Sequence, residues 1–314
     1  MGGRGVGLGL AVGSAATFGT SGSFASSLMA DGWSAAAAVT VRVGIAALLL
    51  TVPALLQLRG QWALLRRSAG AVISYGVFAI GAAQLFFFNA VEHVSVGVAL
   101  LLEYSGTLLV VAWVWLRHGQ RPRRLTVIGG AVAIVGLILV LDILGSAHID
   151  PLGVLCGLGA ATGLAVYFVL SSKTHDQLPP MALAWAGLSI GTVVLLVAGA
   201  TGIVPMRAST ADTKLAGHHT SWLVPVIGLS LVAAVIAYSA GIAAARLLGA
   251  RFASFVGLAE VLAAVLFAWV LLGQRPTAVQ LLGGLVVLAG IALVHADEKG
   301  EAHLAVRPEL EPAV

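Results

Sequence analysis

Long apolar stretches, separated by short polar segments, make up most of this chain of 314 residues. Each stretch is about 18 to 24 residues long, the length that an α-helix needs to cross roughly 30 Å of hydrocarbon. Membrane-spanning β-strands would be about ten residues long and would alternate apolar with polar positions. The pattern therefore predicts an all-α membrane protein with ten transmembrane helices. The expected spans are residues 6–28, 34–57, 69–90, 94–116, 125–144, 151–170, 181–204, 222–245, 252–272 and 278–295.

The composition agrees with a chain that lies in lipid. Hydrophobic residues make up 59% of the chain, charged residues 10%, and the mean hydropathy is +1.02, so there are too few charges to cover a soluble domain. The net charge of +4 comes from arginines that are dispersed among loops, which argues against a nucleic-acid partner. The single cysteine, Cys156, excludes an internal disulfide and a cysteine metal site.

One motif occurs twice, as WLRHGQRP at residues 115–122 and as WVLLGQRP at residues 269–276. Its glycines, Gly119 and Gly273, are 154 residues apart, and the same offset aligns two later Gly-Gly pairs. The chain is therefore predicted to be a duplication. The first five-helix repeat covers residues 1–144 and the second covers 151–296. The acidic segment 297–314 is expected to be a disordered cytoplasmic tail.

Lysine and arginine predict the orientation of the helices, because these residues concentrate on the cytoplasmic side of a membrane. With the N-terminus inside, 13 of the 17 lie inside, three lie outside, and Arg42 lies within a span. The inner set is Arg4, Arg59, Arg66, Arg67, Arg117, Arg121, Arg123, Arg124, Lys173, Arg246, Arg251, Lys299 and Arg307; the outer set is Arg207, Lys214 and Arg275. We therefore expect a multi-pass protein of the plasma (inner) membrane with both termini in the cytoplasm.

The number of helices in each repeat is odd, so the second repeat has to enter the membrane from the opposite side. Two inverted five-helix repeats are the expected result. Inverted repeats place a substrate site near the middle of the membrane, at the interface between the repeats, and allow alternating access. The organisation therefore favours transport of a small molecule.

Three charged residues, Arg42, Glu103 and Glu260, lie deep inside predicted spans, where an unpaired charge is costly. Each is roughly 12 to 14 Å from one end of its helix, at a rise of about 1.5 Å per residue. The internal alignment pairs Glu103 with Gly257 and Gly106 with Glu260. The two carboxylates therefore lie on one face of equivalent helices, and we expect both to point at a shared cavity.

Each charge has a functional and a structural interpretation. Desolvation disfavours the charged form of a carboxyl group, so Glu103 is expected to bind a substrate amine or a proton; the alternative is a structural ion pair with Arg42. Arg42 keeps its proton and would hold a carboxylate. Glu260 either lines the site or makes a hydrogen bond between helices. Three uncharged residues of similar depth complete the candidate set for substrate binding or coupling: Gln84, Tyr104 and Tyr238.

Glycines repeat at four-residue spacing in two spans, and helices with such faces pack closely. The glycines are Gly5, Gly9 and Gly13 in the first span, and Gly153 with Gly157 and Gly159 with Gly163 in the sixth. We expect these two helices to pack closely within the chain. A homodimer interface is the alternative.

The sequence contains one match to an enzyme motif, but the residues that such an enzyme needs beside it are missing. The segment Gly187-Leu-Ser189-Ile-Gly191 fits Gly-x-Ser-x-Gly, but it lies within a span and has no histidine or acid nearby in the sequence. The chain has no phosphate-binding Gly-x-x-x-x-Gly-Lys-Ser/Thr loop, which excludes ATP-driven pumping by this chain. The paired histidines of the loop 205–221 are interpreted as part of a solvated linker. We therefore expect neither an enzyme nor a cofactor or metal site.

Two five-helix halves, each ending in Trp-x-x-x-Gly-(Glu/Gln)-Arg-Pro and a Gly-Gly helix, resemble the EamA-type drug/metabolite transporter superfamily over residues 5–296. The segments SFASSLM (23–29), VR (41–42), YG (75–76) and VALLLEYSG (98–106) look like its threonine/homoserine exporter branch. The resemblance implies a ten-helix bundle around a central cavity. Thr107 and Val261 stand where the family usually has proline, and Gln120 and Gln274 where it has glutamate. Without the prolines, the fourth and ninth helices are expected to be straighter.

The sequence therefore predicts a secondary active transporter that exports amino acids or related small metabolites, with proton antiport as the coupling that the resemblance implies. A drug or metabolite efflux facilitator without proton coupling is the alternative within transport. Outside transport, the alternative is a membrane scaffold subunit, whose polar residues would lie on an outer interface. The expected partners are the lipid bilayer, a small-molecule substrate and protons.

Overall fold

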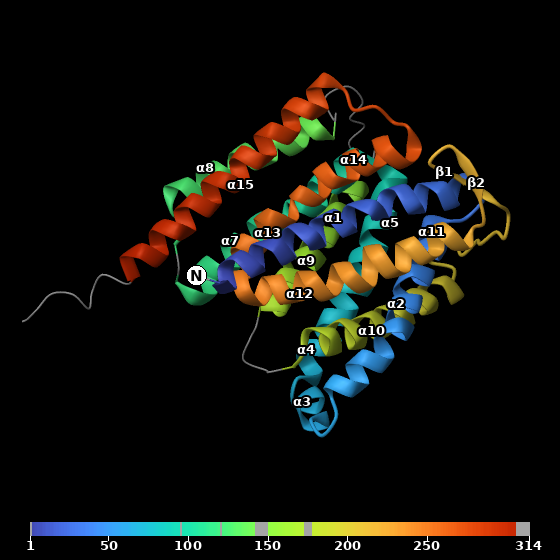
Figure 1. The fold of residues 1–314 in the computed structure, drawn as a ribbon, viewed down its shortest axis with the longest axis horizontal. Coiled ribbons are helices and arrows are strands. Elements are labelled where there is room, and N and C mark those ends of the chain that lie inside the picture. The colour runs from blue at the N-terminus through green and yellow to red at the C-terminus, as the bar shows by residue number, and fades with distance from the viewer. Residues whose placement is uncertain (1, 95, 120, 142–149, 173–177, 306–314) are drawn as a thin grey trace, which may run out of the picture.

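The structure is a computed structural model that describes residues 2–94, 96–119, 121–141, 150–172 and 178–305. These residues are helical apart from loops and one hairpin of two short strands (Figure 1). The first part of the chain forms α1 (Gly2–Ala30), α2 (Ala35–Gln57), α3 (Trp62–Arg67), α4 (Ala69–Ser74), the π-helix η1 (Tyr75–Ala82), α5 (Ala83–His93), α6 (Val96–Tyr104), α7 (Gly106–His118) and α8 (Arg124–Val140). The second part forms α9 (Pro151–Ser172), α10 (Pro180–Ala200), β1 (Thr213–Leu215), β2 (His218–Thr220), α11 (Leu223–Ile227), the π-helix η3 (Gly228–Ile236), α12 (Ala237–Leu248), α13 (Ala250–Gly257), α14 (Ala259–Leu272) and α15 (Ala278–Ala305).

Eight helices in the described part of the chain are long and apolar enough to cross a membrane, and they match eight of the ten predicted spans. The predicted span 6–28 falls on α1, which is rich in glycine, serine and threonine. The predicted span 125–144 falls on α8, a shorter apolar helix of 17 residues, and its last residues, 142–144, lie outside the described residues. The structure therefore confirms a nearly all-helical membrane protein, whereas ten spans remains a prediction.

The two halves share backbone details at positions 154 residues apart. In the first half η1 precedes α5, and at the equivalent position in the second half η3 precedes α12. Gly119 ends α7 and Gly273 ends α14, both in the left-handed region, with φ of 67° and 72°. Glycine adopts this conformation without the steric cost of a Cβ. The two halves therefore resemble each other in local backbone conformation as well as in sequence.

The fourth and ninth predicted spans are each interrupted by one residue, although both lack proline. The expectation that they are straighter than in proline-containing relatives stays a prediction. Ser105 separates α6 from α7, and Leu258 separates α13 from α14. The backbone tightens at both breaks, with hydrogen bonds from Leu108 N to Ser105 O (2.8 Å) and from Val261 N to Leu258 O (3.2 Å). In the first half, the Ser105 hydroxyl also donates to the carbonyl of Leu102 (2.5 Å), a local bond of the kind that bends helices without proline.

The first helix of each half packs against the other half. α1 contacts η3, α12, α13 and α14, and α9 contacts the equivalent η1, α5, α6 and α7. Figure 1 shows α1 lying between α12 and α14. α2 and α10 contact each other, and each also contacts the π-helix of the opposite half. The two sets of contacts are equivalent, as a two-fold relation between the halves would make them.

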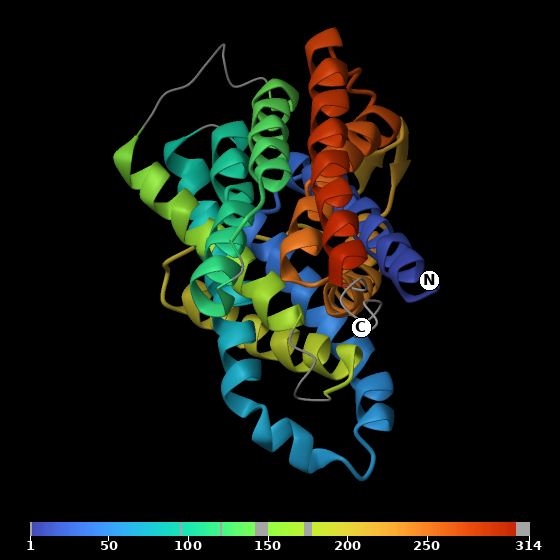
Figure 2. The ribbon, with the colours of Figure 1, turned by 90° about the vertical axis from the view of Figure 1, so that its left-hand side faces the viewer.

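α8 and α15 pair along their length, and Figure 2 shows them side by side. Glycines allow the backbones to meet. A Cβ on Gly136 would lie 2.5 Å from Val287 N, and a Cβ on the equivalent Gly290 would lie 2.6 Å from Ala133 N. Both distances are too short for real atoms, so this contact depends on the missing side chains.

The segment predicted as a tail begins as helix. α15 continues to Ala305, and Asp297 is buried. The Oδ2 atom of Asp297 accepts hydrogen bonds from the Thr126 N–H (3.1 Å) and the Thr126 hydroxyl (2.5 Å), which joins α15 to the first turn of α8. The remaining tail residues, 306–314, lie outside the described residues.

The loop predicted as a solvated linker folds into the β1–β2 hairpin. Ala216 and Gly217 form its turn with positive φ of 53° and 78°, as a two-residue hairpin turn requires. The Thr213 hydroxyl donates to the carbonyl of Ser27 (2.7 Å), and Ala216 N donates to the carbonyl of Leu271 (2.7 Å). The hairpin thus ties the end of α1 to the end of α14. We call this side of the molecule, opposite the start of α1 in Figure 1, the hairpin end.

The two glycine stripes differ in what they contact. A Cβ on each stripe glycine of α9 would come within 3 Å of the first half: the four are Gly153, Gly157, Gly159 and Gly163. A Cβ on Gly5, Gly9 or Gly13 would meet nothing within 4 Å in the described structure. Close packing within the chain is therefore confirmed for α9 and wrong for the α1 stripe. The homodimer alternative stays a prediction.

Candidate functional site

A cavity of about 780 Å³ lies between the two halves. At the hairpin end its wall includes the exposed residues Met29 and Gln274. On the opposite side the lining ends at the buried residues Ala11, Ala244 and Ala253. The cavity is therefore open at the hairpin end and sealed on the other side, which we call the closed side.

All six candidate residues from the sequence line this cavity. They come from five helices of both halves: Arg42 from α2, Gln84 from α5, Glu103 and Tyr104 from α6, Tyr238 from α12, and Glu260 from α14. The structure thus brings together residues that are as many as 218 positions apart in the chain. Their roles in binding remain predictions.

Arg42 is held by uncharged groups. Its Nη1 donates to the Ser21 hydroxyl (2.8 Å) and its Nη2 to the carbonyl of Ala233 (2.9 Å). The guanidinium carbon lies 5.7 Å from the centroid of the Phe18 ring, within the range of a cation–π contact. No acidic residue among those described forms an ion pair with Arg42 within 4.0 Å. The structural alternative of an ion pair with Glu103 is therefore not what the structure contains.

The two carboxylates flank the helix breaks. Glu103 lies two residues before the break at Ser105, and Glu260 lies two residues after the break at Leu258. Both are half-buried, and both line the same cavity as Arg42. Two carboxylates and one guanidinium therefore share one cavity, which suits a ligand that carries an amine.

Tyr104 contributes an interhelical contact to the same wall. Its hydroxyl lies beside the carboxylate of Glu260, although α6 and α14 belong to different halves. The contact between helices that a structural role of Glu260 requires is therefore present. It does not exclude ligand binding, because Glu260 also lines the cavity.

Gln84 and Tyr238 each lie two residues after a π-helix, at equivalent positions. A π-helical turn changes the direction in which the following side chains leave the helix, and such turns are frequent at functional sites. The Tyr238 ring meets the Phe18 ring edge to face, with 4.9 Å between centroids, and the Tyr167 ring with 5.9 Å. Phe18 thus connects Tyr238 with Arg42.

Several residues of the wall were not among the six candidates. Phe18, Phe168 and the exposed Arg275 all line the cavity. A signal for Phe18 exists in the sequence, since it lies four residues after Ser14 and three before Ser21 and so shares one face of α1 with two hydroxyl groups. Arg275 belongs to a loop, and loop residues give no such periodic signal.

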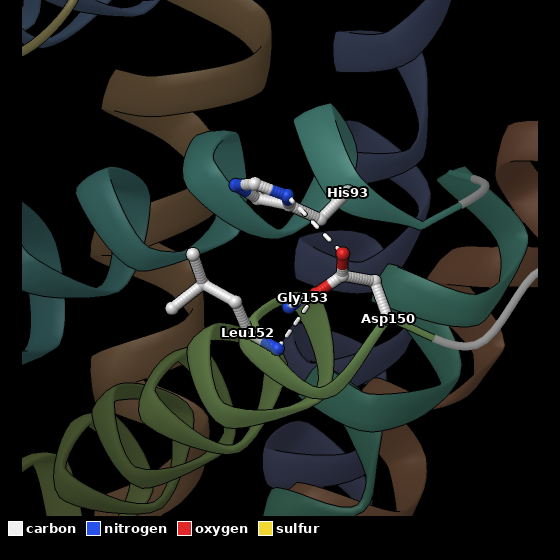
Figure 3. A network of polar contacts seen from close by, with 4 residues as sticks. All are labelled: His93, Asp150, Leu152 and Gly153. Atoms are coloured by element: carbon white, nitrogen blue, oxygen red, sulfur yellow. Dashed lines mark hydrogen bonds and ion pairs between the residues drawn. The ribbon is translucent and has the colours of Figure 1, made fainter.

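One polar network lies outside the cavity, where α5 ends and α9 begins. The Oδ1 atom of Asp150 accepts hydrogen bonds from Leu152 N (2.7 Å) and Gly153 N (3.3 Å), and Oδ2 lies 3.7 Å from Nδ1 of His93 (Figure 3). Asp150 therefore caps the N-terminus of α9, where helices leave N–H groups without partners.

Membrane-spanning helices around a charged cavity that is open at one end are the arrangement that a membrane transporter needs. The profile of the EamA-like transporter family matches this chain twice, at residues 5–142 and 151–296. The chain therefore belongs to the EamA-like transporter family, and it is a multi-pass inner-membrane transporter and not an enzyme.

Known proteins with similar sequences include two kinds of bacterial transporter. The chain is 28% identical to the threonine/homoserine exporter RhtA of Escherichia coli strain K12, over 70% of this chain and 69% of that protein. It is 24% identical to the uncharacterized inner membrane transporter YicL of Salmonella typhimurium, over 76% of this chain and 77% of that protein. One solved crystal structure shares the fold, with a TM-score of 0.76 over 93% of this chain and 97% of the other, at 17% identity.

Proposed function

We propose that this transporter exports amino acids or related small metabolites in exchange for protons. The observation that carries the proposal is the presence of Arg42, Glu103 and Glu260 in one cavity. An amino acid has a carboxylate and an amine close together, and the cavity offers both a cation and two anions to bind them. The name of the RhtA relatives, which export threonine and homoserine, supports the same class of cargo.

In this proposal Arg42 binds the substrate carboxylate. A guanidinium has five N–H donors, of which two are used in the bonds to Ser21 and Ala233, so donors remain for a ligand. Those bonds and the Phe18 ring fix the group before the ligand arrives, which lowers the entropic cost of binding. Arg42 thus acts as a rigid anchor.

Glu103 binds the substrate amine in one half of the cycle and a proton in the other. One carboxylate that serves both ligands in turn couples them, because the two compete for one site. Glu260 adds a second negative charge nearby and holds Tyr104 against the cavity. Gln84, Tyr104 and Tyr238 supply uncharged donors that orient the substrate.

We further propose that residues 1–144 and 151–296 are two inverted five-helix repeats with ten spans in total. The equivalent contacts of α1 and α9 support this arrangement, as does the distribution of basic residues. With both termini in the cytoplasm, the hairpin end faces outward. The cavity is then open to the outside, the state in which an exporter releases its cargo and takes up a proton.

The test is export from cells loaded with a panel of labelled amino acids. We expect efflux of at least one amino acid that requires the chain, falls when an uncoupler removes the proton gradient, and is lost in Glu103→Gln. Asp31→Asn is the matched control, since Asp31 is a carboxylate outside the cavity lining and should behave like wild type.

Two results would contradict the proposal in different ways. Efflux that ignores the uncoupler and survives in Glu103→Gln would favour a facilitator without proton coupling. No efflux of any amino acid from cells that hold the folded chain in the membrane would exclude this class of cargo.

A further inference from the structure

A short basic segment joins α2 to α4 on the side of the molecule away from the hairpin. Residues 58–68, which we call the arginine segment, include α3 and carry Arg59, Arg66 and Arg67, all with exposed side chains. Figure 2 shows this segment, in light blue, protruding beyond the neighbouring helices. Three cations are therefore gathered in a short stretch at the edge of the molecule.

The arginine segment lies at the level of a membrane surface. α2 begins beside the loop that leads into β1, where Ser34 N donates to the carbonyl of Arg207 (2.9 Å), and it runs for 23 residues. At about 1.5 Å per residue, a helix of this length crosses the whole hydrocarbon layer of roughly 30 Å. The segment that follows α2 is therefore placed among the lipid headgroups on the side opposite the hairpin end.

The three arginines are not neutralised by the described part of the chain. Among the described residues, no group forms an ion pair or a hydrogen bond with any of their guanidinium groups. The excess of basic residues on the cytoplasmic side of a membrane accounts for their sign, but it supplies no anion. Like charges in one segment repel one another, so an anion that binds among them is stabilised by all three.

The protein holds the arginine segment in place through its leucines. Leu58 is fully buried, and Leu64 and Leu65 of α3 pack against the main hydrophobic core. Gly60, with a φ of 74°, allows the chain to turn away from α2 before α3 begins. The arginines are thus presented outward by an ordered backbone, which lowers the entropic cost of binding a ligand.

An exposed apolar stripe leads along α2 to the arginine segment. Leu48, Val52 and Leu56 are 74%, 66% and 57% exposed, and their four-residue spacing places them on one face of the helix. Arg59 follows Leu56 within one further turn. Trp62, which is 46% exposed, lies in the same segment, and tryptophan is enriched where apolar helices meet the headgroups. Apolar surface and cationic groups therefore adjoin in the order in which a phospholipid presents its acyl chain and its phosphate.

We propose that the arginine segment binds the headgroup of an anionic phospholipid whose acyl chain lies along the stripe of Leu48, Val52 and Leu56. Guanidinium groups bind phosphate oxygens in pairs, which gives the site its preference for this headgroup. The stripe favours a lipid over a soluble phosphate, which has no apolar part. In the proposed orientation the lipid belongs to the cytoplasmic leaflet. The inference concerns neither cargo nor protons, so it goes beyond the proposed function and does not rest on it.

The charge of the segment sets the expected size of the effect. A basic residue beside an anionic lipid surface contributes roughly fivefold to the affinity, so the loss of three should weaken binding by roughly 100-fold. A zwitterionic lipid with the same acyl chains has no net charge for the arginines to attract. It should therefore bind this site much more weakly than the anionic lipid.

The experiment is native mass spectrometry of the purified full chain in a neutral detergent, titrated with phosphatidylglycerol or with phosphatidylcholine of the same acyl chains. We expect the tightest phosphatidylglycerol to bind wild type more strongly than any phosphatidylcholine. In the triple variant Arg59→Gln/Arg66→Gln/Arg67→Gln, the Kd of that lipid should rise by roughly 100-fold. All three side chains are exposed, so we expect the variant to fold.

The matched control removes the same charge from another exposed basic loop that is assigned to the same side of the membrane. It is the triple variant Arg117→Gln/Arg121→Gln/Arg123→Gln. The control should keep the tight phosphatidylglycerol. Equal losses in the two triple variants would show that the lipid responds only to diffuse charge, and equal binding of the two lipids by wild type would show no preference for an anion. Either result would overturn the proposal.

Two further measurements complete the test. If the triple variant of the arginine segment does not insert into the membrane, Arg66→Gln/Arg67→Gln removes two of the charges and should still weaken the tight lipid by roughly tenfold or more. An unchanged Kd would overturn the proposal. Glycerol 3-phosphate, a soluble headgroup without acyl chains, should not displace the lipid at millimolar concentration. Full displacement would assign the segment to a soluble phosphate and contradict a lipid site.

Discussion

The paired helices α8 and α15 give a prediction that tests the internal repeat at atomic detail. A Cβ on Gly136 would lie 2.5 Å from Val287 N, and a Cβ on Gly290 would lie 2.6 Å from Ala133 N. Gly136 and Gly290 are equivalent at the offset of 154, and so are Ala133 and Val287. The contact of Gly136 with Val287 is therefore equivalent to the contact of Gly290 with Ala133. Gly136→Ala and Gly290→Ala should destabilise the protein by the same amount.

The size of the effect follows from the distances. An ordinary contact needs about 3.4 Å or more, so the helices would have to separate by roughly 0.8 to 0.9 Å at either site, and overpacking of this kind costs about 1–3 kcal/mol. The atoms that an added Cβ would meet belong to the backbone, so a change of side-chain rotamer cannot relieve the contact. In the double variant the separation is shared, so its cost should be less than the sum of the two single costs.

The second glycine of each Gly-Gly pair provides the matched control. A Cβ on Gly130 would lie 3.4 Å from the Phe255 ring, and a Cβ on Gly284 would lie 3.3 Å from a methyl group of Leu262. Both neighbours are ends of side chains that can adjust, and alanine gains about 0.5–1 kcal/mol over glycine within a helix. Thermal unfolding in detergent should show a lower apparent Tm for Gly136→Ala and Gly290→Ala than for Gly130→Ala and Gly284→Ala. Unequal losses for the first pair, or losses of the same size in the second pair, would refute the reasoning.

Three further predictions concern the site, a helix end and the topology. Arg42→Lys keeps the charge but cannot bond both the Ser21 hydroxyl and the Ala233 carbonyl. Losing one such bond costs about 1.5–3 kcal/mol, so the KM for the exported substrate should rise roughly tenfold or more. An unchanged KM would remove Arg42 from the site. Asp150→Ala removes the cap of α9 and should lower the free energy of unfolding by about 1 kcal/mol in a denaturation series, more than any loss from His93→Ala. Cysteines at the exposed, equivalent positions Arg123 and Thr277, in a Cys156→Ser background, should be labelled from opposite sides of the membrane; labelling from one side would exclude inverted repeats.

The charged residues of the site could be predicted from the sequence because charged residues are rare within membrane-spanning helices. Arg42, Glu103 and Glu260 stand out among apolar neighbours, and the internal repeat placed the two carboxylates on related helix faces. The same repeat paired Gln84 with Tyr238. All of these residues line the cavity.

Other features depend on contacts that no single stretch of sequence encodes. The sequence suggested a carboxylate as the partner of Arg42. Its hydrogen bonds instead go to a serine of α1 and a carbonyl of η3, and these two elements lie next to α2 only in the folded protein. The break at Ser105 coincides with a hydrogen bond from the serine hydroxyl to the Leu102 carbonyl, a contact that the absence of proline did not predict.

The central claim is that one cavity carboxylate, Glu103, couples export to protons. The most direct measurement uses purified protein in proteoliposomes, with an acidic interior imposed and the labelled amino acid identified in cells added outside. We predict accumulation above the external concentration that an ionophore abolishes, and no accumulation by Glu103→Gln. Accumulation by Glu103→Gln equal to that of wild type would contradict the account.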